Sequence, residues 1–303
     1  MTPKMCLRHL ARARALAAGL VILLCSCGQK AQQAALTQSL PDSPPDPFLQ
    51  TLDEQDYIAH ALGGIDGHSY TNSLEALWRS YEGGARLFEA DIHLTSDGKA
   101  VLVHGFEKND YLKRIGEQYY PEEGIEAGGE YLPSFDEFMG FEIQGQYQPL
   151  DFSMLADFIR AHNDMYVLVD IWAQDYDGTK KTYTAICEAC GYDAQVLDHL
   201  IAGGHTKEMI YAVENVYSFK HLNLYYSDEI IDDSFTTDDF IAFCSDRGIE
   251  SYSIADDSFT ADLFERLREG GLISYVFTVN DPERARVLLA CGVDAVGSDF
   301  IRE

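Results

Sequence analysis

Residues 86–94 read Arg-Leu-Phe-Glu-Ala-Asp-Ile-His-Leu and alternate with a period of two, which predicts a β-strand. The apolar members of the alternation are Phe88, Ala90, Ile92 and Leu94. The opposite face carries Glu89, Asp91 and His93. Carboxylates on the inner side of a sheet are costly to desolvate unless a cation neutralises them, so this face predicts a bound metal. Oxygen ligands of this kind suit Mg or Ca better than Zn.

Two further apolar runs end at a histidine. Tyr57–Leu62 contains His60 and is followed by a Gly-Gly pair, and Ala100–Val103 is followed directly by His104. Strand-like and helix-like segments alternate along the chain from Tyr57, as in parallel α/β proteins, whose active sites lie at strand ends. We therefore expect both histidines near one site. The alternative for the strand at 86–94, an edge strand whose charged face meets water, stays open.

The combined pattern resembles the glycerophosphodiester phosphodiesterases, relatives of the phosphatidylinositol-specific phospholipases C. Its parts are His60, Asn72 just before a helix, Glu-x-Asp at 89 and 91, Leu-Thr-x-Asp-Gly at 94–98, and His104. The resemblance resumes at 167–171 and 275–299 and covers most of residues 57–303. It implies an α/β fold, a somewhat irregular TIM-type (β/α)8 barrel, with an insertion after the third strand. This insertion, residues 105–150, is expected to cover the active-site mouth.

The resemblance also implies the roles of the site residues. Glu89, Asp91 and Asp170 would hold one divalent cation, Mg or Ca. His60 and His104 would act as general acid and general base, with the assignment between them open. The predicted substrate contacts are Asn72, His93, Trp172 and Phe277. Phe277 shares a face with Tyr275, and packing in the barrel core is the alternative for both.

Three positions depart from the family pattern. Ala61 stands where an arginine usually follows the first histidine, and Gly105 stands where an aspartate usually follows the second. Trp172 replaces a lysine two residues after the third carboxylate. These changes remove fixed charges that would act on the phosphate or on charge that develops in the transition state.

The sequence therefore predicts a metal-dependent phosphoric diester hydrolase that cleaves glycerophosphodiesters, or related lipid headgroup phosphodiesters, by histidine acid/base catalysis. Two alternatives stay open. One is a phospholipase C-like lyase that releases a cyclic phosphate, and the other is a catalytically weak surface lipoprotein that binds a headgroup.

The N-terminal residues predict export. Four basic residues precede the apolar run 15–24, and residues 1–26 resemble a bacterial lipoprotein signal peptide followed by Cys27, the predicted lipidation site. An ordinary secretory signal is the alternative. Residues 27–50 predict a flexible linker rich in Gln, Ser and Pro, and residues 51–303 predict the barrel. The protein is thus expected in a bacterial cell envelope, anchored to a membrane through Cys27.

The charge balance limits the partners. Of 22 Lys and Arg, removal of the four in the predicted signal peptide leaves 18 against 50 Asp and Glu, a net charge of −32. Such a field excludes nucleic acid as a partner and repels phosphate, so a phosphodiester site needs a local positive centre.

The remaining elements follow from periodicity and caps. The predicted later strands are Met165–Trp172, Met209–Val213, Leu222–Tyr226, Glu250–Ile254, Ile273–Val279 and Val293–Gly297. The predicted helices are 73–81, 152–161, 237–247, 260–268 and 282–291. With the three earlier strands this gives one strand more than eight. Only five residues join the strands at 86–94 and 100–103, too few for a parallel crossover, so this unit is either locally antiparallel or an irregular part of the barrel.

Overall fold

The computed structural model describes residues 46–121, 125 and 129–300. The predicted signal peptide, Cys27 and most of the predicted linker lie outside these residues. Helix α2 (Pro47–Glu54) begins within the range predicted as a linker, so residues 47–50 are helical. Pro47 fits the first turn of a helix, and the Asp46 side chain accepts a hydrogen bond from the Phe48 amide at 3.0 Å.

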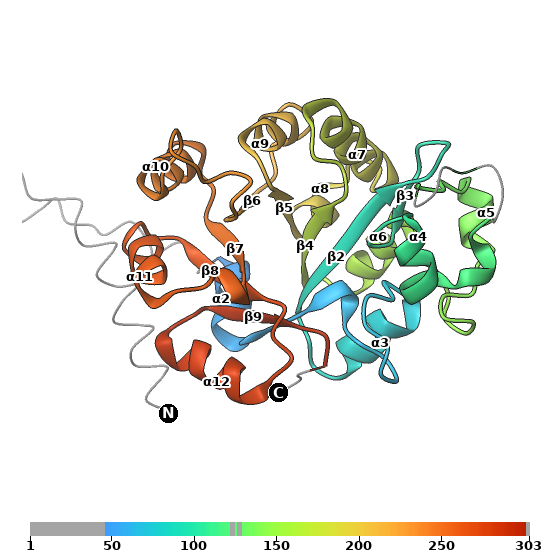
Figure 1. The fold of residues 1–303 in the computed structure, drawn as a ribbon, viewed down its shortest axis with the longest axis horizontal. Coiled ribbons are helices and arrows are strands. Elements are labelled where there is room, and N and C mark those ends of the chain that lie inside the picture. Colours follow the sequence, from blue (N-terminus) through green and yellow to red (C-terminus); the bar gives the residue numbers. More distant parts are fainter. Residues whose placement is uncertain (1–45, 122–124, 126–128, 301–303) are drawn as a thin grey trace, which may run out of the picture. The chain divides into compact units, whose positions relative to one another are not determined.

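Eight parallel strands close into a barrel (Figure 1). They are β1 (Tyr57–Ala59), β2 (Leu87–Leu94), β4 (Tyr166–Ile171), β5 (Leu200–Gly204), β6 (His221–Tyr225), β7 (Ser251–Ala255), β8 (Ile273–Phe277) and β9 (Ala295–Ser298). The ring closes because β1 pairs with β2 on one side and with β9 on the other. The predicted TIM-type barrel is confirmed.

Helices surround the ring and bury their apolar faces against it (Figure 1). They are α3 (Leu74–Glu82), α6 (Phe152–Ala161), α7 (Tyr176–Ala189), α8 (Ala194–Leu197), α9 (Lys207–Glu214), α10 (Thr237–Arg247), α11 (Ala261–Glu269) and α12 (Pro282–Cys291). Ser73 caps α3, and threonines or aspartates cap those that follow. Among the described residues, no helix combines the length and apolar character needed to cross a membrane.

The extra strand is β3 (Ala100–Leu102), which lies outside the ring. It pairs antiparallel with β2, and the turn at 95–99 joins the two strands as a hairpin. This confirms that the unit is locally antiparallel, and it explains why the sequence showed more than eight strands.

The predicted strand at 209–213 is wrong, because these residues lie in α9. The Thr206 side chain accepts a hydrogen bond from the Met209 amide and starts the helix. The true strand, β5, ends in two glycines that hide its pattern. A Cβ at Gly203 would lie 2.5 Å from the Val169 carbonyl oxygen, so glycine lets β4 and β5 approach here.

The insertion folds into short helical turns and an aromatic core. Its elements are α4 (Lys108–Asp110), η2 (Tyr111–Ile115), η3 (Glu117–Tyr119) and α5 (Phe135–Met139), and two more turns, η1 (His60–Leu62) and η4 (Asp256–Ser258), follow β1 and β7. Phe106 and Phe138 pack edge to face at 5.6 Å, and Tyr119 stacks on Phe141 at 4.1 Å. In Figure 1 the insertion (green) lies beside β3.

Candidate active site

Three carboxylates converge inside the barrel. Glu89 and Asp91 project from β2 and Asp170 from β4, and the strand register pairs Asp91 with Asp170. One oxygen of each carboxylate lies within 4.8 Å of the others. The predicted ligands therefore come together, and His93 is outside this group.

The electrostatics of the cluster suit a cation. Burial, together with Asp91 and Asp170, raises the pKa of Glu89 well above its usual value, and burial also raises the pKa of Asp91. Burial opposes ionisation of Asp170 too, but His205, whose Nε2 lies 2.8 Å from Oδ1, lowers the pKa of this carboxyl. Glu89 Oε1 is buried and has no hydrogen-bond partner among the described residues. Three crowded carboxylates and an orphaned oxygen fit a divalent cation.

The loop after β1 supports the carboxylates. The amide of Ala61 donates to Glu89 Oε2 at 2.7 Å, and the Asn72 side chain donates to Asp91 Oδ2 at 2.7 Å. Ala61 and Asn72 both have positive φ angles, 48° and 46°, which are uncommon for residues other than glycine. Backbone strain of this kind gathers at functional sites.

His60 follows β1 and is almost fully buried. Its Nδ1 lies 2.8 Å from Oδ1 of Asp299, which follows β9, and Asn280 holds the other oxygen of Asp299 at 2.7 Å. Nε2 of His60 is 3.9 Å from Glu89 Oε2 and 3.4 Å from the Thr278 hydroxyl. The Asp299 contact fixes the ring and leaves Nε2 beside the carboxylate cluster.

His104 follows β3 and is paired with the insertion. Asp110 Oδ1 lies 3.1 Å from its Nδ1, and Arg114 hydrogen-bonds the same carboxylate. Burial lowers the pKa of His104, but the Asp110 hydrogen bond and the nearby Asp91 charge outweigh it and raise the pKa above its usual value. The Asp110 contact therefore favours the protonated form of His104.

Tyr70 lies between the two histidines. Its ring packs edge to face on His60 at 4.6 Å and on His104 at 5.2 Å. Burial raises the pKa of Tyr70 to about 12, so its hydroxyl keeps its proton and can donate a hydrogen bond.

The predicted substrate contacts have different surroundings. Asn72 is fully buried and both ends of its amide bind Asp91, so it positions this carboxylate. His93 packs against Phe106 and Trp172, and its Nε2 lies 2.9 Å from a Glu130 oxygen in the insertion.

Trp172 and Phe277 line open space. Trp172 is 37% exposed and borders a pocket that also contains Asp91, His104, Asp170 and His205. Phe277 borders a second pocket inside the barrel, lined in part by His60, Glu89, Asp170, Tyr225 and Tyr275. Both pockets meet at Asp170, so the carboxylate cluster separates an outer from an inner chamber.

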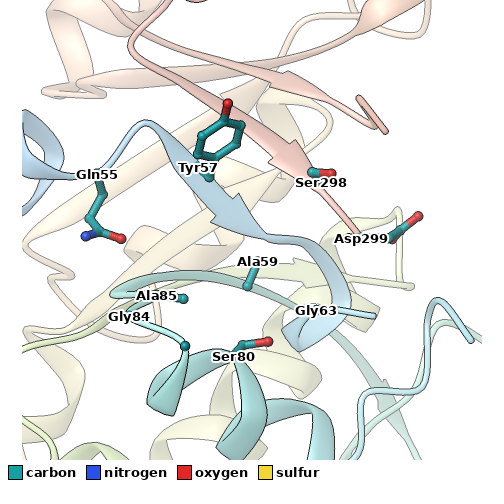
Figure 2. Close-up of a pocket in the computed structure, with 10 residues that line it drawn as sticks. Gln55, Tyr57, Ala59, Gly63, Ser80, Gly84, Ala85, Ser298 and Asp299 are labelled. Atoms are coloured by element: carbon teal, nitrogen blue, oxygen red, sulfur yellow. The ribbon is translucent and has the colours of Figure 1, made fainter. Parts of the chain in front are cut away.

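A third cavity lies apart from this chemistry. Figure 2 shows that it lies between β1 and α3, where Ser80 faces Gly63. Its lining includes Asp299, the partner of His60, but neither candidate catalytic histidine and none of the three clustered carboxylates.

Several residues of the site escaped the sequence analysis: Tyr70, Asp110, Arg114, His205 and Asp299. His205 follows β5 and Asp299 follows β9, so position at a strand end could have indicated both, had β5 been recognised. Tyr70, Asp110 and Arg114 lie in loops and short turns, whose paths no periodic pattern predicts.

Comparisons with known proteins agree with the motifs. Residues 64–126 match the model of the glycerophosphoryl diester phosphodiesterase family. A search of curated proteins finds no sequence that matches.

Solved structures share the fold at low identity. A Silicibacter pomeroyi DSS-3 protein, provisionally named a glycerophosphoryl diester phosphodiesterase, aligns with a TM-score of 0.67 at 16% identity, over 81% of this chain and 90% of its own. An Oleispira antarctica phosphodiesterase in complex with the product sn-glycerol-3-phosphate aligns with a TM-score of 0.61 at 17% identity, over 81% of this chain and 93% of its own. The Thermotoga maritima glycerophosphodiester phosphodiesterase aligns with a TM-score of 0.59 at 18% identity, over 81% of this chain and 94% of its own. Residues 64–126 are thus similar to the glycerophosphoryl diester phosphodiesterases, which are phosphoric diester hydrolases, and the chain shares the fold of these solved structures.

Proposed function

We propose that this protein hydrolyses glycerophosphodiesters with two histidines and one divalent cation. The observation that carries the proposal is the convergence of three carboxylates, Glu89, Asp91 and Asp170, with His60 and His104, each histidine oriented by a carboxylate of its own. The family match supports the same chemistry, since it includes Glu89, Asp91 and His104.

Glu89, Asp91 and Asp170 would hold the cation. All three offer oxygen ligands, which favour Mg or Ca. When bound there, such an ion supplies positive charge to a non-bridging phosphate oxygen. Asn72 and the Ala61 amide keep two of the carboxylates in place for this purpose.

The carboxylate partners favour different roles for the two histidines. Asp299 binds Nδ1 of His60, so Nε2, which faces the carboxylate cluster, would accept a proton from the attacking hydroxyl group or water. The Asp110 hydrogen bond raises the pKa of His104 and favours its protonated form, so His104 would donate a proton to the oxygen of the departing alcohol. His60 would thus be the general base and His104 the general acid.

Hydrolysis to an open phosphate is favoured over a lyase reaction that ends at a cyclic phosphate. The relative from Oleispira antarctica contains sn-glycerol-3-phosphate, an open monoester, as its product. Trp172, exposed beside His104, would contact the departing headgroup, and Phe277 would line the inner chamber.

The direct test is turnover by the full chain with glycerophosphocholine and glycerophosphoinositol, with the phosphorus products followed by NMR. We expect sn-glycerol 3-phosphate and the free alcohol. A cyclic phosphate that accumulates without opening would identify a lyase instead. Headgroup binding without turnover, in folded protein supplied with Mg or Ca, would identify a binding protein.

We further propose, from the N-terminal sequence pattern alone, that the protein is exported and anchored to a membrane through Cys27. Replacement Cys27→Ser should then release the protein from the membrane fraction of the cells that express it. Membrane association that survives this change would exclude the anchor.

A further inference from the structure

We propose that Arg114, in the insertion, binds the phosphate group of the substrate. This inference rests on the proposed phosphodiesterase function and adds a phosphate contact that the sequence patterns did not indicate. The chemical class recognised is a phosphodiester monoanion, or the phosphate monoester that remains after cleavage.

Arg114 lies against the candidate catalytic groups. Its Nη1 hydrogen-bonds Asp110, the carboxylate that orients His104, and lies 3.1 Å from His104 Nδ1. The guanidinium carbon is 4.5 Å from the centre of the Tyr70 ring, whose edge-to-face contacts reach both histidines. The guanidinium is therefore one side chain away from His60 and in direct contact with His104.

Arg114 has donors left for a ligand. A guanidinium carries five N–H donors in a planar fork. Nη1 is engaged by Asp110, whereas Nε and Nη2 make no hydrogen bond or ion pair with any residue that the structure describes. The side chain is 22% exposed, so solvent, and hence an anion, reaches it. A phosphate matches the two remaining donor groups of the fork.

The surroundings of Arg114 are strongly acidic, so a positive side chain is required to bind phosphate there. The chain has a net charge of −28, and three carboxylates line the site, so an approaching phosphate is repelled unless a cation faces it. Positions 61 and 172 hold Ala and Trp, which offer no charge. Among the described lysines and arginines, Arg114 is the one seen in contact with a candidate catalytic histidine. Arg284, at the start of α12, is paired with Asp256 instead.

The competing role is purely structural, with Arg114 serving only to hold Asp110 against His104. The two roles predict different kinetics. Loss of a phosphate contact weakens binding of substrate and product, whereas loss of a clamp disturbs His104 and shifts the pH profile without weakening phosphate binding.

The test compares Arg114→Gln, Arg114→Lys and the neighbouring control Lys113→Gln, which removes the same charge from an exposed position on the same turn. Turnover of glycerophosphocholine gives kcat and KM, and calorimetric titration with inorganic phosphate gives a Kd that does not depend on turnover. Thermal melting confirms that each variant is folded.

We expect Arg114→Gln to raise KM and the phosphate Kd roughly 10- to 100-fold, because a charge-assisted bidentate contact is lost. The KM and phosphate Kd of Arg114→Lys should lie between those of Arg114→Gln and wild type. Lys113→Gln should change KM and the phosphate Kd less than about 2-fold. Should Arg114→Gln fail to fold, the phosphate Kd of Arg114→Lys compared with that of Lys113→Gln decides whether Arg114 binds phosphate.

An unchanged phosphate Kd in the folded Arg114 variants would overturn the proposal, and a shifted pH profile alone would assign Arg114 the clamp role. If wild type lacks turnover, the proposed function fails, but a phosphate Kd that depends on Arg114 still supports this contact. Wild type that binds no phosphate would overturn it.

Discussion

The two histidines of the site are held by different carboxylates. His60 is buried with Asp299, which the end of the last barrel strand supplies, whereas His104 is partly exposed and depends on Asp110 from the insertion. The barrel therefore orients one candidate catalytic histidine and the insertion orients the other.

Replacing either histidine by alanine should remove a proton transfer step. We expect His60→Ala and His104→Ala each to lower kcat by roughly 100-fold or more. The control is His162→Ala, since His162 lies outside the site and packs on Trp78, Tyr81 and Phe158. A rate equal to wild type in either site variant would remove that histidine from the mechanism.

The pH dependence of kcat/KM should depend on the pairing of Asp110 with His104. Burial opposes protonation of His104, but Asp110 and the Asp91 charge raise its pKa, while the Arg114 charge lowers it. A general acid loses activity as the pH rises through its pKa, so kcat/KM should fall on the alkaline side. Asp110→Asn removes the partner carboxylate and lowers the pKa of His104, which moves this decline to lower pH.

A cation bound by Asp91 would cancel the influence of that carboxylate on His104, but not that of Asp110. Asp157→Asn, which breaks a surface pair with Arg160, is the control and should leave the profile in place. An alkaline limb that stays in place in Asp110→Asn would contradict the assignment of His104 as the acid.

Among the structural elements, the junction between β3 and the insertion decides how the second histidine is held. At Gly105 a Cβ would lie 2.8 Å from Asp110 Oδ2 and 3.2 Å from the Trp172 ring. The Asp110 carboxylate thus occupies the space beside residue 105.

Gly105→Ala should displace Asp110 or Trp172. Because misplacement of a catalytic group by about 1 Å can cost up to 100-fold in rate, we expect kcat/KM to fall roughly 10- to 100-fold. Trp172 borders an open pocket, whereas Asp110 is buried, so a fall in melting temperature would indicate that Asp110 is the group displaced. Wild-type kinetics in this variant would show that the junction tolerates a side chain and that Asp110 is not held against it.

The elements that the sequence predicted well are those with a strong period or a clear cap. The alternation in β2 indicated two of the three carboxylates, and the family resemblance indicated Asp170 in β4. Helices α10 and α12 were bounded correctly by their capping residues. β5 and α9 were confused because the strand is short and ends in glycines, while the first apolar residues of the helix are contiguous.

The remaining parts of the site depend on contacts between segments far apart in the sequence. Asp299 contacts His60 only when the barrel closes. Tyr70, which contacts both histidines, is a loop residue with a φ of 57°. Neither contact leaves a local pattern. Long-range closure and loop geometry are thus the parts that sequence analysis did not reach.

For the molecule as a whole, the acidic charge makes a bound cation stabilising. Any ion that binds the folded chain alone adds about 2.7 kcal/mol to the free energy of unfolding at 100 times its Kd. Mg or Ca should therefore raise the melting temperature of EDTA-treated protein. NaCl at matched ionic strength is the control for screening.

Glu89→Gln should abolish most of this rise, since it removes one ligand charge. An equal rise in Glu89→Gln and in wild type would place the ion elsewhere on the acidic surface.

The measurement that bears most directly on a metal-assisted phosphodiesterase is turnover of glycerophosphocholine by the EDTA-treated full chain as Mg or Ca is added back. We predict that EDTA abolishes turnover, that one of these ions restores it with saturation, and that folded Glu89→Gln does not respond over the same range. Full turnover in EDTA, or the same metal titration in Glu89→Gln as in wild type, would contradict the account.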